Sequence, residues 1–393
     1  MPLPVRSLLA STVLLLLVSG GAANAQQQEL TGLQLVVNDA ATAANAPDLV
    51  SVPVGDHTLR LPPGFSVSTL ASGLSHPRFM LYDPAGNLLV ADMAGGIFRF
   101  TPADLPSSAP PGPLIAGLDA PSNLAFHDGY LYVGETGAVS RFTYDPASGA
   151  LGGREVVVPD LPRGGHSTRT LVFGPEGEMY VSVGSSCNIC DERDARRAAI
   201  SRYAADGSGG QVFASGLRNA VGLAIQPGSG VLWATVNERD NQGNEIPPDL
   251  VTMVRGGENF GWPTCQPPYA VPQDPGAACA GITPPTIGIQ AHSAPLGLAF
   301  YAGQAFPPDY AGDLLVAQHG SWNRTPPAQP KLLRVHFDGG VPTNVQDFAT
   351  GWQDQSGNRW GRPVGLAVAP DGSLVVSDDD SGSLYRISYA SAA

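Results

Sequence analysis

Cationic side chains recur at one position of a repeated pattern along this chain, just before a short apolar segment. The copies are Arg78, His166 with Arg169, Arg218 and Arg362. Guanidinium groups suit planar, paired contacts with carboxylates and phosphates. Several such groups at one place repel one another unless an anion lies among them. The pattern therefore predicts a site for a polyanion, provided that the fold brings these side chains together.

An alternative interpretation pairs each arginine with a carboxylate of the protein itself. Acidic residues end the second apolar segment of several repeats, at Asp92, Glu135 and 378–380. Any single arginine can be neutralised in this way. For the set as a whole, recurrence in four repeats favours a shared ligand.

His166 is the candidate general base. It follows Gly164 and Gly165, and a backbone without side chains lets the next residue approach a ligand closely. A neutral imidazole can take a proton from a hydroxyl group near pH 7. The alternative is a structural histidine held by hydrogen bonds.

Oxygen-bearing side chains crowd the segment 237–245, which reads NERDNQGNE. Calcium takes carboxylate, amide and main-chain carbonyl ligands of this kind. Because the spacing is not that of an EF-hand loop, a solvated acidic loop is the alternative interpretation.

The elements that would position these residues form a six-fold internal repeat. Each unit has an apolar strand, a turn with Gly or Pro, a second apolar strand, a variable loop and a further strand. Copies begin near residues 77, 121, 166, 218, 295 and 362. Three or four short strands per unit, repeated in this way, are typical of β-propellers. The chain is therefore predicted to be all-β, as a six-bladed β-propeller.

The loops after the second strand are uneven in length. They are long in blades three, four and five (185–199, 237–249 and 318–331) and short in blades one and two, and an insertion at 256–294 links blades four and five. These loops share a face with the starts of the inner strands, because strand two returns antiparallel to strand one. Long loops gathered on one face predict that this is the binding face.

The segment 61–74 is predicted to close the ring, as the last strand of blade six beside 385–389. The domain of residues 56–393 is then the catalytic propeller. Residues 26–55 are interpreted as an N-terminal extension with one strand at 33–37. Residues 1–25 have the charged start, short apolar core and Ala-Asn-Ala end of a signal peptide, which predicts a periplasmic or secreted protein.

Charge and cysteines narrow the function classes further. A net charge of −13 argues against binding to nucleic acid, and the apolar run near the start is too short for stable membrane insertion. Four cysteines in an exported chain suggest two disulfides, Cys187–Cys190 and Cys265–Cys279. A redox-active dithiol at Cys187 and Cys190 is the alternative.

The chain resembles the soluble sugar dehydrogenases that depend on pyrroloquinoline quinone (PQQ), and the sorbosone and pyranose dehydrogenases more closely than the glucose dehydrogenases. HSTRTL with SVGSSC (166–187), GLRN (216–219), GGENFGWP (256–263) and HGSWNR (319–324) carry the likeness, which covers nearly all of residues 56–389. It implies oxidation of an aldose, or of a related sugar or aldehyde, by hydride transfer to PQQ. PQQ and calcium would lie over the channel, and an external acceptor would take the electrons.

The resemblance also implies roles for individual residues. His166 matches the general base, Arg218 the arginine beside the reactive quinone carbonyl, and Arg362 an arginine on a cofactor carboxylate. Asp240 and Asn241 match the segment that holds the metal. The remaining candidates for cofactor binding are Arg78, Asn219, His319, Asn323 and Arg324.

Two positions depart from the glucose dehydrogenases. Ser185 stands where they carry the aspartate that orients the histidine, and Gly165 where they carry an acidic residue. These departures leave open a different orienting partner or reduced activity. Four loop aromatics are candidates for stacking on a sugar or on PQQ, with ordinary packing as the alternative: Trp262, Tyr269, Trp322 and Trp360.

Two other functions stay open from the sequence. One is a calcium-dependent lactonase or other hydrolase, because such enzymes also use six-bladed propellers. The other is a propeller that binds carbohydrate without catalysis, which would not require His166 together with Arg218 and Arg362.

Overall fold

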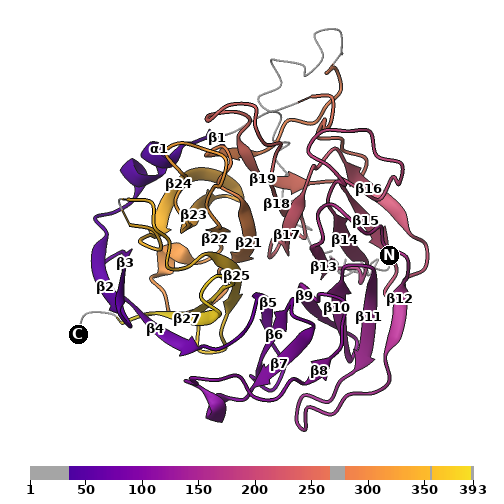
Figure 1. Ribbon diagram of the computed structural model, residues 1–393, viewed down its shortest axis with the longest axis horizontal. Helices are drawn as coiled ribbons and strands as arrows, with labels where there is room; N and C mark the ends of the chain where they lie inside the picture. Colours follow the sequence, from indigo (N-terminus) through magenta and orange to yellow (C-terminus); the bar gives the residue numbers. More distant parts are fainter. Residues whose placement is uncertain (1–34, 266–278, 355, 391–393) are drawn as a thin grey trace, which may run out of the picture. The chain divides into compact units, whose positions relative to one another are not determined.

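The computed structural model describes residues 35–265, 279–354 and 356–390. Six sheets of these residues are arranged in a ring as the blades of a β-propeller (Figure 1). The six-bladed, all-β prediction is confirmed. The predictions for residues 1–25 and for Tyr269 concern positions outside the described residues.

Each blade consists of strands that follow one another along the chain, except the last. Blade one contains β5 (Pro77–Tyr82), β6 (Leu88–Asp92), β7 (Gly96–Phe100) and β8 (Ile115–Ala116); blade two, β9 (Asn123–His127), β10 (Tyr130–Glu135), β11 (Ala138–Thr143) and β12 (Glu155–Val158); blade three, β13 (Arg169–Phe173), β14 (Met179–Val183), β15 (Ala199–Tyr203) and β16 (Gln211–Ser215). Blade four contains β17 (Ala220–Ile225), β18 (Leu232–Val236), β19 (Asp249–Val254) and β20 (Ile287–Ile289); blade five, β21 (Pro295–Phe300), β22 (Leu314–Gln318), β23 (Lys331–Asp338) and β24 (Val341–Ala349).

Blade six joins the two ends of the propeller. It contains β25 (Pro363–Val368), β26 (Leu374–Asp378), β27 (Ser383–Tyr389) and β4 (Phe65–Ala71). Strand β4 pairs antiparallel with β27, with Val67 opposite Ile387. The predicted closure of the ring is therefore confirmed, because a strand from the N-terminal side completes the blade that the C-terminal strands begin.

The second strand of most blades is buried along its whole length. Strands β6, β14, β18, β22 and β26 have every residue buried. A strand covered on both faces reads as a continuous apolar run rather than an alternating one. This explains segments such as LLVAQ and LVVSD, and it fixes the ends of these strands against the neighbouring blades.

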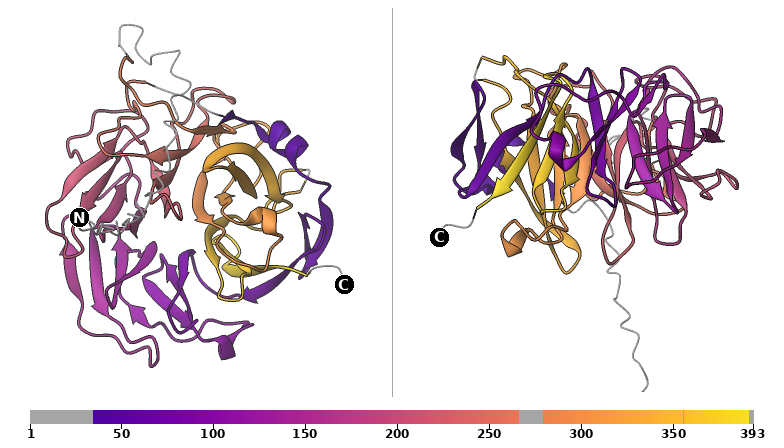
Figure 2. Two further views of the ribbon diagram at one scale, coloured as in Figure 1. Left: turned by 180° about the vertical axis from the view of Figure 1, so that it is seen from behind. Right: turned by 90° about the horizontal axis from the view of Figure 1, so that it is seen from below.

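The N-terminal extension packs along the outer strands of blades four, five and six. Strand β1 (Leu35–Val36) pairs parallel with β20 and falls within the predicted strand at 33–37. Helix α1 (Asp39–Asn45) begins at Asn38, whose side chain accepts a hydrogen bond from Ala41, and it contacts β24. The hairpin of β2 (Val50–Val54) and β3 (His57–Leu61) lies beside β4, as both views in Figure 2 show.

Two short 3-10 helices, η1 (Pro102–Asp104) and η2 (Pro308–Tyr310), complete the secondary structure of the described residues. Both predicted disulfides, Cys187–Cys190 and Cys265–Cys279, are present. None of the helices in the described part of the chain combines the length and apolarity that crossing a membrane requires.

Candidate active site

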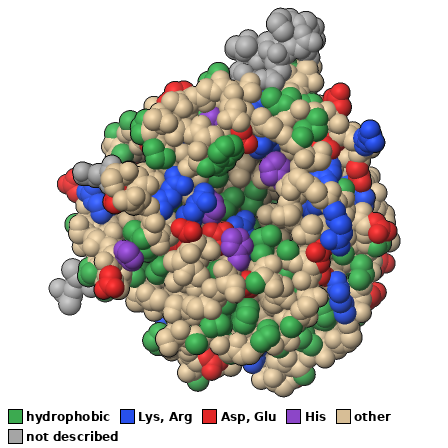
Figure 3. All heavy atoms as spheres, in the orientation of Figure 1, with side chains coloured by type: hydrophobic (Ala, Val, Ile, Leu, Met, Phe, Trp, Pro, Cys, Tyr) green, Lys and Arg blue, Asp and Glu red, His purple; other side chains and the backbone are tan. Residues whose placement is uncertain are grey.

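The inner strands leave a cavity of about 280 Å³ between them. Each blade contributes an apolar side chain to its wall: Phe79, Leu124, Leu171, Leu223, Leu298 and Leu366. On the face seen in Figure 3, cationic and histidine side chains gather around a central hollow with hydrophobic groups inside it. Charged groups around a low-dielectric channel interact more strongly than they would in open water.

His166 is held by the main chain of blade three. Its Nδ1 lies 2.9 Å from the carbonyl oxygen of Ser185 and 3.1 Å from the hydroxyl of the same residue, and that hydroxyl donates to the carbonyl of Cys187. Because a carbonyl oxygen only accepts, Nδ1 carries the proton and Nε2 keeps its lone pair. Within the described residues, Nε2 has no hydrogen-bond partner.

The environment of His166 favours the neutral base. Burial lowers the pKa of His166 below its ordinary value of 6.5, and the nearby charge of Arg218 lowers it further. The Ser185 carbonyl is therefore the orienting partner that sequence reasoning left open. A carbonyl fixes the tautomer as a carboxylate would, but it does not raise the basicity of the ring as strongly.

The backbone also explains why Gly165 precedes His166. Gly165 has φ +64°, and a Cβ atom there would lie 2.4 Å from Cα of Ser186 and 2.6 Å from the carbonyl oxygen of Ser185. An acidic side chain does not fit at this position without moving that strand end. The departure at Gly165 is thus part of the same local structure that supplies the carbonyl to His166.

Arg218 connects blades three and four. Its side chain is 5% exposed and donates to the carbonyls of Asn188, Asn237 and Glu238, to Oδ1 of Asn188, and to Asp240 at 2.8 Å. These contacts use all five N–H groups of the guanidinium. A direct contact between Arg218 and a ligand would therefore require it to exchange one of these bonds.

Asn219 lies close to His166, where both approach Gly184. A Cβ atom on Gly184 would lie 2.3 Å from Oδ1 of Asn219 and 2.7 Å from Cβ of His166, so the three residues meet at one point. Oδ1 of Asn219 is buried and has no hydrogen-bond partner in the described part of the protein. An unpaired buried acceptor is costly unless another group satisfies it.

The predicted metal segment is the meeting point of three long loops. Asp240 accepts hydrogen bonds from Arg218 and from Asn323, and its carbonyl accepts one from Asn188. Asn241 follows with φ +62°. The amide oxygens of Asn237 and Asn323 are buried beside this segment and unpartnered among the described residues. The loops of blades three, four and five therefore contact one another, as their placement on one face predicts.

Arg362 and its neighbour Arg359 form a cationic pair at the start of blade six. Arg362 donates to the carbonyls of His319 and Gly320, and Arg359 donates to Gln353 and to the carbonyl of Ser321. Burial lowers the pKa of both guanidinium groups. The charge of Arg362 lowers the pKa of Arg359 further, whereas Asp379 and Asp380 partly oppose the fall in the pKa of Arg362. Within the described ranges, neither forms an ion pair with a carboxylate.

Arg78 behaves differently, as the alternative interpretation predicted. It forms an ion pair of 2.6 Å with Asp379, whose side chain is 4% exposed. His319 lies 2.7 Å and His76 3.4 Å from the same carboxylate. Burial would raise the pKa of Asp379, but the hydrogen bond with His319 and the charge of Arg78 bring it well below its usual value. Burial lowers the pKa of His319 to about 4, so it is neutral at pH 7.

Two arginines that the sequence predicted for the cofactor site, Arg169 and Arg324, instead bind groups of the protein elsewhere. Arg169 is completely buried, and its guanidinium donates to the carbonyls of Pro162, His166 and Thr168, so the expectation that it reaches the channel mouth is wrong. It supports the backbone that carries His166 instead. Arg324 pairs with Glu245 and donates to the carbonyl of Pro326.

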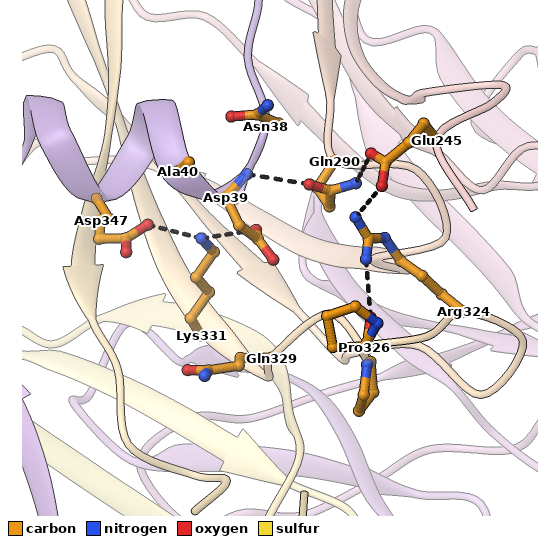
Figure 4. Close-up of a pocket in the computed structure, with 12 residues that line it drawn as sticks. Asn38, Asp39, Ala40, Glu245, Gln290, Arg324, Pro326, Gln329, Lys331 and Asp347 are labelled. Carbon is orange, nitrogen blue, oxygen red and sulfur yellow. Dashed lines mark hydrogen bonds and ion pairs between the residues drawn. The ribbon is translucent and has the colours of Figure 1, made fainter. Parts of the chain in front are cut away.

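Arg324 lines a second cavity, of about 510 Å³, between α1 and the loops of blades four and five (Figure 4). This cavity is the larger one, yet its wall contains neither His166 nor Arg218. Lys331 is buried there between Asp39 and Asp347. The candidate base and its neighbouring arginine therefore do not line this cavity.

The loop aromatics divide between packing and exposure. Trp262 is buried and donates to the carbonyl of Asn188, and Trp360 stacks on His57 with ring centres 4.3 Å apart. Trp322 is 73% exposed, which leaves it free to contact a ligand. Sequence reasoning did not single out Asn188, Arg359, His76 or the Ser185 carbonyl. Only the acidic run 378–380 gave a signal for Asp379.

A family model described as TrAA12-like matches residues 59–278 and 272–390. The chain belongs to the TrAA12-like family. A pyrroloquinoline quinone-dependent sugar dehydrogenase of Hypocrea jecorina is 26% identical over 392 residues, which cover 82% of this chain and 87% of that protein. A pyrroloquinoline quinone-dependent pyranose dehydrogenase of Coprinopsis cinerea is 27% identical over 82% of this chain but only 54% of its own length.

Solved structures of two related enzymes have a similar fold. The holo form of the pyranose dehydrogenase PQQ domain from Coprinopsis cinerea superposes with a TM-score of 0.73 at 25% identity, covering 86% of this chain and 98% of that domain. A calcium structure of a Trichoderma reesei enzyme of family AA12 has a TM-score of 0.75 at 23% identity, covering 86% and 98%. At that lower identity the likeness concerns the fold alone.

Proposed function

We propose that this chain is a PQQ-dependent sugar dehydrogenase of the glucose/sorbosone type. It would oxidise an aldose, or a related sugar or aldehyde, and pass the electrons to an external acceptor. The observation that carries the proposal is the pair Arg359 and Arg362, whose guanidinium groups bond only neutral oxygens within the described residues. The relatives named for PQQ and sugar or pyranose support the cofactor and the substrate class.

The cationic groups suit the carboxylates of PQQ. Arg359 and Arg362 are partly buried and next to each other, so a bound anion would relieve both their desolvation and their mutual repulsion. Arg78 and His319 already share the carboxylate of Asp379. Their contribution to PQQ binding would be through shape and hydrogen bonding more than through net charge.

The polar oxygens near Asp240 suit calcium. The unpartnered amide oxygens of Asn237 and Asn323 flank the segment, and calcium prefers oxygen ligands of this kind. Asp240 and Asn241 remain the proposed metal-binding residues, with these two amides as further candidates. Arg218 already forms an ion pair with Asp240, so a calcium ion at this segment would lie close to a second positive charge. The negative charge of PQQ would offset the charges of calcium and Arg218 together.

His166 supplies the general base in this proposal. Its Nε2 holds a lone pair, is fixed in orientation by the carbonyl of Ser185, and stays unprotonated at pH 7 because burial lowers its pKa. It can therefore take the proton of a substrate hydroxyl. When bound, PQQ would supply the quinone that accepts a hydride. Arg218 places a positive charge beside the site, where it favours developing negative charge.

Export remains part of the proposal. The signal-peptide pattern of residues 1–25 predicts a periplasmic or secreted enzyme, with 26–55 as an extension and 56–393 as the catalytic propeller. The disulfides Cys187–Cys190 and Cys265–Cys279 agree with an oxidising compartment.

Dye reduction by the purified protein tests the proposal. The apoprotein is incubated with PQQ and calcium and assayed with a panel of aldoses and aldehydes, with PQQ and calcium each omitted as controls. We expect reduction that requires both. Lactone hydrolysis without PQQ would instead identify a hydrolase. Binding of sugar without turnover or PQQ uptake would identify a carbohydrate-binding propeller.

A further inference from the structure

Asn188 forms five hydrogen bonds with three separate parts of the candidate site. Its Oδ1 accepts from Nη2 of Arg218 at 3.0 Å and from the main-chain N–H of Asp240 at 2.7 Å. Its Nδ2 donates to the carbonyl of Asp240 at 3.0 Å. Its own carbonyl accepts from Nε of Arg218 at 3.2 Å and from the indole of Trp262 at 3.0 Å. One residue of blade three therefore connects to both elements of blade four that the site uses.

The loop that carries Asn188 is itself fixed. Asn188 lies between Cys187 and Cys190, which form a disulfide. The hydroxyl of Ser185 donates to the carbonyl of Cys187, and Glu192 accepts hydrogen bonds from the main chain and hydroxyl of Ser186. Ser185 also holds His166, so the same short loop orients the base and the Arg218–Asp240 pair.

We propose that Asn188 is a positioning residue of the cofactor site, and that the Cys187–Cys190 disulfide is the brace that holds it in place. This inference rests on the proposed function. An amide side chain offers an acceptor and a donor side by side. The acceptor serves the N–H of Asp240 and the guanidinium of Arg218, and the donor serves the C=O of Asp240. With Asn188 in place, Arg218 and Asp240 are arranged before a ligand arrives, which reduces the entropic cost of binding it.

The consequence is that loss of Asn188 weakens PQQ binding through Arg218 and Asp240. Outer groups that orient the ligands of a bound metal or cofactor typically change affinity by about 10- to 100-fold when they are removed. Asn188→Ala should fall in this range. Asn188→Asp keeps the shape and the acceptor for Arg218, but it loses the donor to the Asp240 carbonyl and adds a negative charge, so it should also bind PQQ more weakly.

The test is the Kd of PQQ in the presence of calcium, measured by absorption titration of the full-length mature protein. Asn344→Ala, on the outer strand β24, is the matched control and should stay within about twofold of wild type. Melting temperatures of the apoproteins show whether each variant is folded. An Asn188→Ala variant that melts normally and binds PQQ as tightly as wild type, or more tightly, overturns the inference.

A double-mutant cycle separates positioning from general loosening of the fold. Because part of the effect of Asn188 passes through Arg218, Asn188→Ala should weaken PQQ binding by a smaller factor in the Arg218→Ala background than in the wild type. Losses that simply multiply would contradict the proposed path. If the wild type takes up no PQQ at all, the proposed function fails, and that result is distinct from a wild type that binds while Asn188 variants bind equally well.

The brace is tested by Cys187→Ser with Cys190→Ser. This variant should show weaker PQQ binding than wild type, in the same direction as Asn188→Ala. Equal affinity of the double serine variant and wild type would overturn the role of the disulfide.

Discussion

Replacing His166 with asparagine should remove the base and leave the local structure in place. The side-chain amide of asparagine can donate to the carbonyl of Ser185, which is 2.9 Å from Nδ1 of His166 in the structure. This preserves a hydrogen bond worth about 1 kcal/mol. The variant has no group in place of Nε2. Positioned general bases contribute about 10²- to 10⁴-fold, or roughly 3–5 kcal/mol of barrier, so kcat should fall by that factor.

The assay is steady-state dye reduction with PQQ and calcium saturating, alongside the Kd of PQQ and the melting temperature. We expect PQQ affinity within about threefold of wild type and an unchanged melting temperature, because a hydrogen bond to Ser185 is retained. The wild-type pH profile of kcat/KM should have an acid limb below pH 6.5, since burial and Arg218 lower the pKa of His166. The limb should vanish in the variant.

A loss of less than tenfold in kcat would refute this reasoning, because another group would then be taking the proton. An acid limb above pH 6.5 in the wild type would contradict the environment described for His166. Loss of PQQ binding together with activity would mean that His166 acts mainly in binding.

Four further outcomes follow from the same geometry. Ser185→Ala keeps the carbonyl that orients His166, so kcat should change by less than about threefold in the dye assay; a 100-fold loss would mean that the hydroxyl is the true partner. Gly165→Ala should lower both kcat and melting temperature, because its Cβ would meet the main chain at 2.4 Å, and an unaffected variant would show that this loop is free to move. Arg362→Ala should weaken PQQ binding by about tenfold or more, while Arg386→Ala, on strand β27, should not; equal PQQ titrations of the two variants would remove Arg362 from the site. Finally, His319 takes up a proton near pH 6.5 in the unfolded chain but only near pH 4 in the folded protein. Between these two values the unfolded state binds more protons, so the melting temperature should drop as the pH falls from 6.5 to 4. His319→Gln should flatten this dependence of melting temperature on pH, and an unchanged slope in the variant would assign the dependence to other groups.

The fold follows from the sequence because one pattern decides it. Six copies of two apolar runs separated by a tight turn leave few architectures other than a six-bladed ring, and the strand at 65–71 completes the ring as predicted. The residues before each inner strand also lie on one face, since strand polarity fixes which ends meet. His166, Arg218, Asn219 and Arg362 are placed by this logic alone.

Contacts between loops are harder to predict. Asn188 is unremarkable in the sequence because its importance comes from Arg218 and Asp240, which belong to another blade. The partner of His166 is a main-chain carbonyl, and side-chain patterns carry no information about it. Arg169 has the right position in its repeat, yet its side chain turns inward to bind carbonyls.

The acidic run 378–380 shows that the sequence does not decide which carboxylate pairs with which arginine. The sequence indicates that a carboxylate stands near the arginines. Only the turn after β26 decides that Asp379 pairs with Arg78, while Asp378 accepts main-chain N–H groups of Arg362 and Ser381. The alternative interpretation therefore holds for Arg78, which pairs with Asp379. In the described part of the chain Arg362 pairs with no carboxylate and donates to main-chain carbonyls instead, so a shared ligand for it stays a prediction.

The proposed function requires guanidinium groups at the channel mouth to hold a negatively charged quinone. The most direct test is the absorption spectrum of PQQ titrated with the protein and calcium at low and high salt. We expect a saturable spectral shift with one PQQ per chain, with binding weaker at high salt and weakened again by Arg362→Ala. A spectrum that stays identical to that of free PQQ at every protein concentration would contradict it.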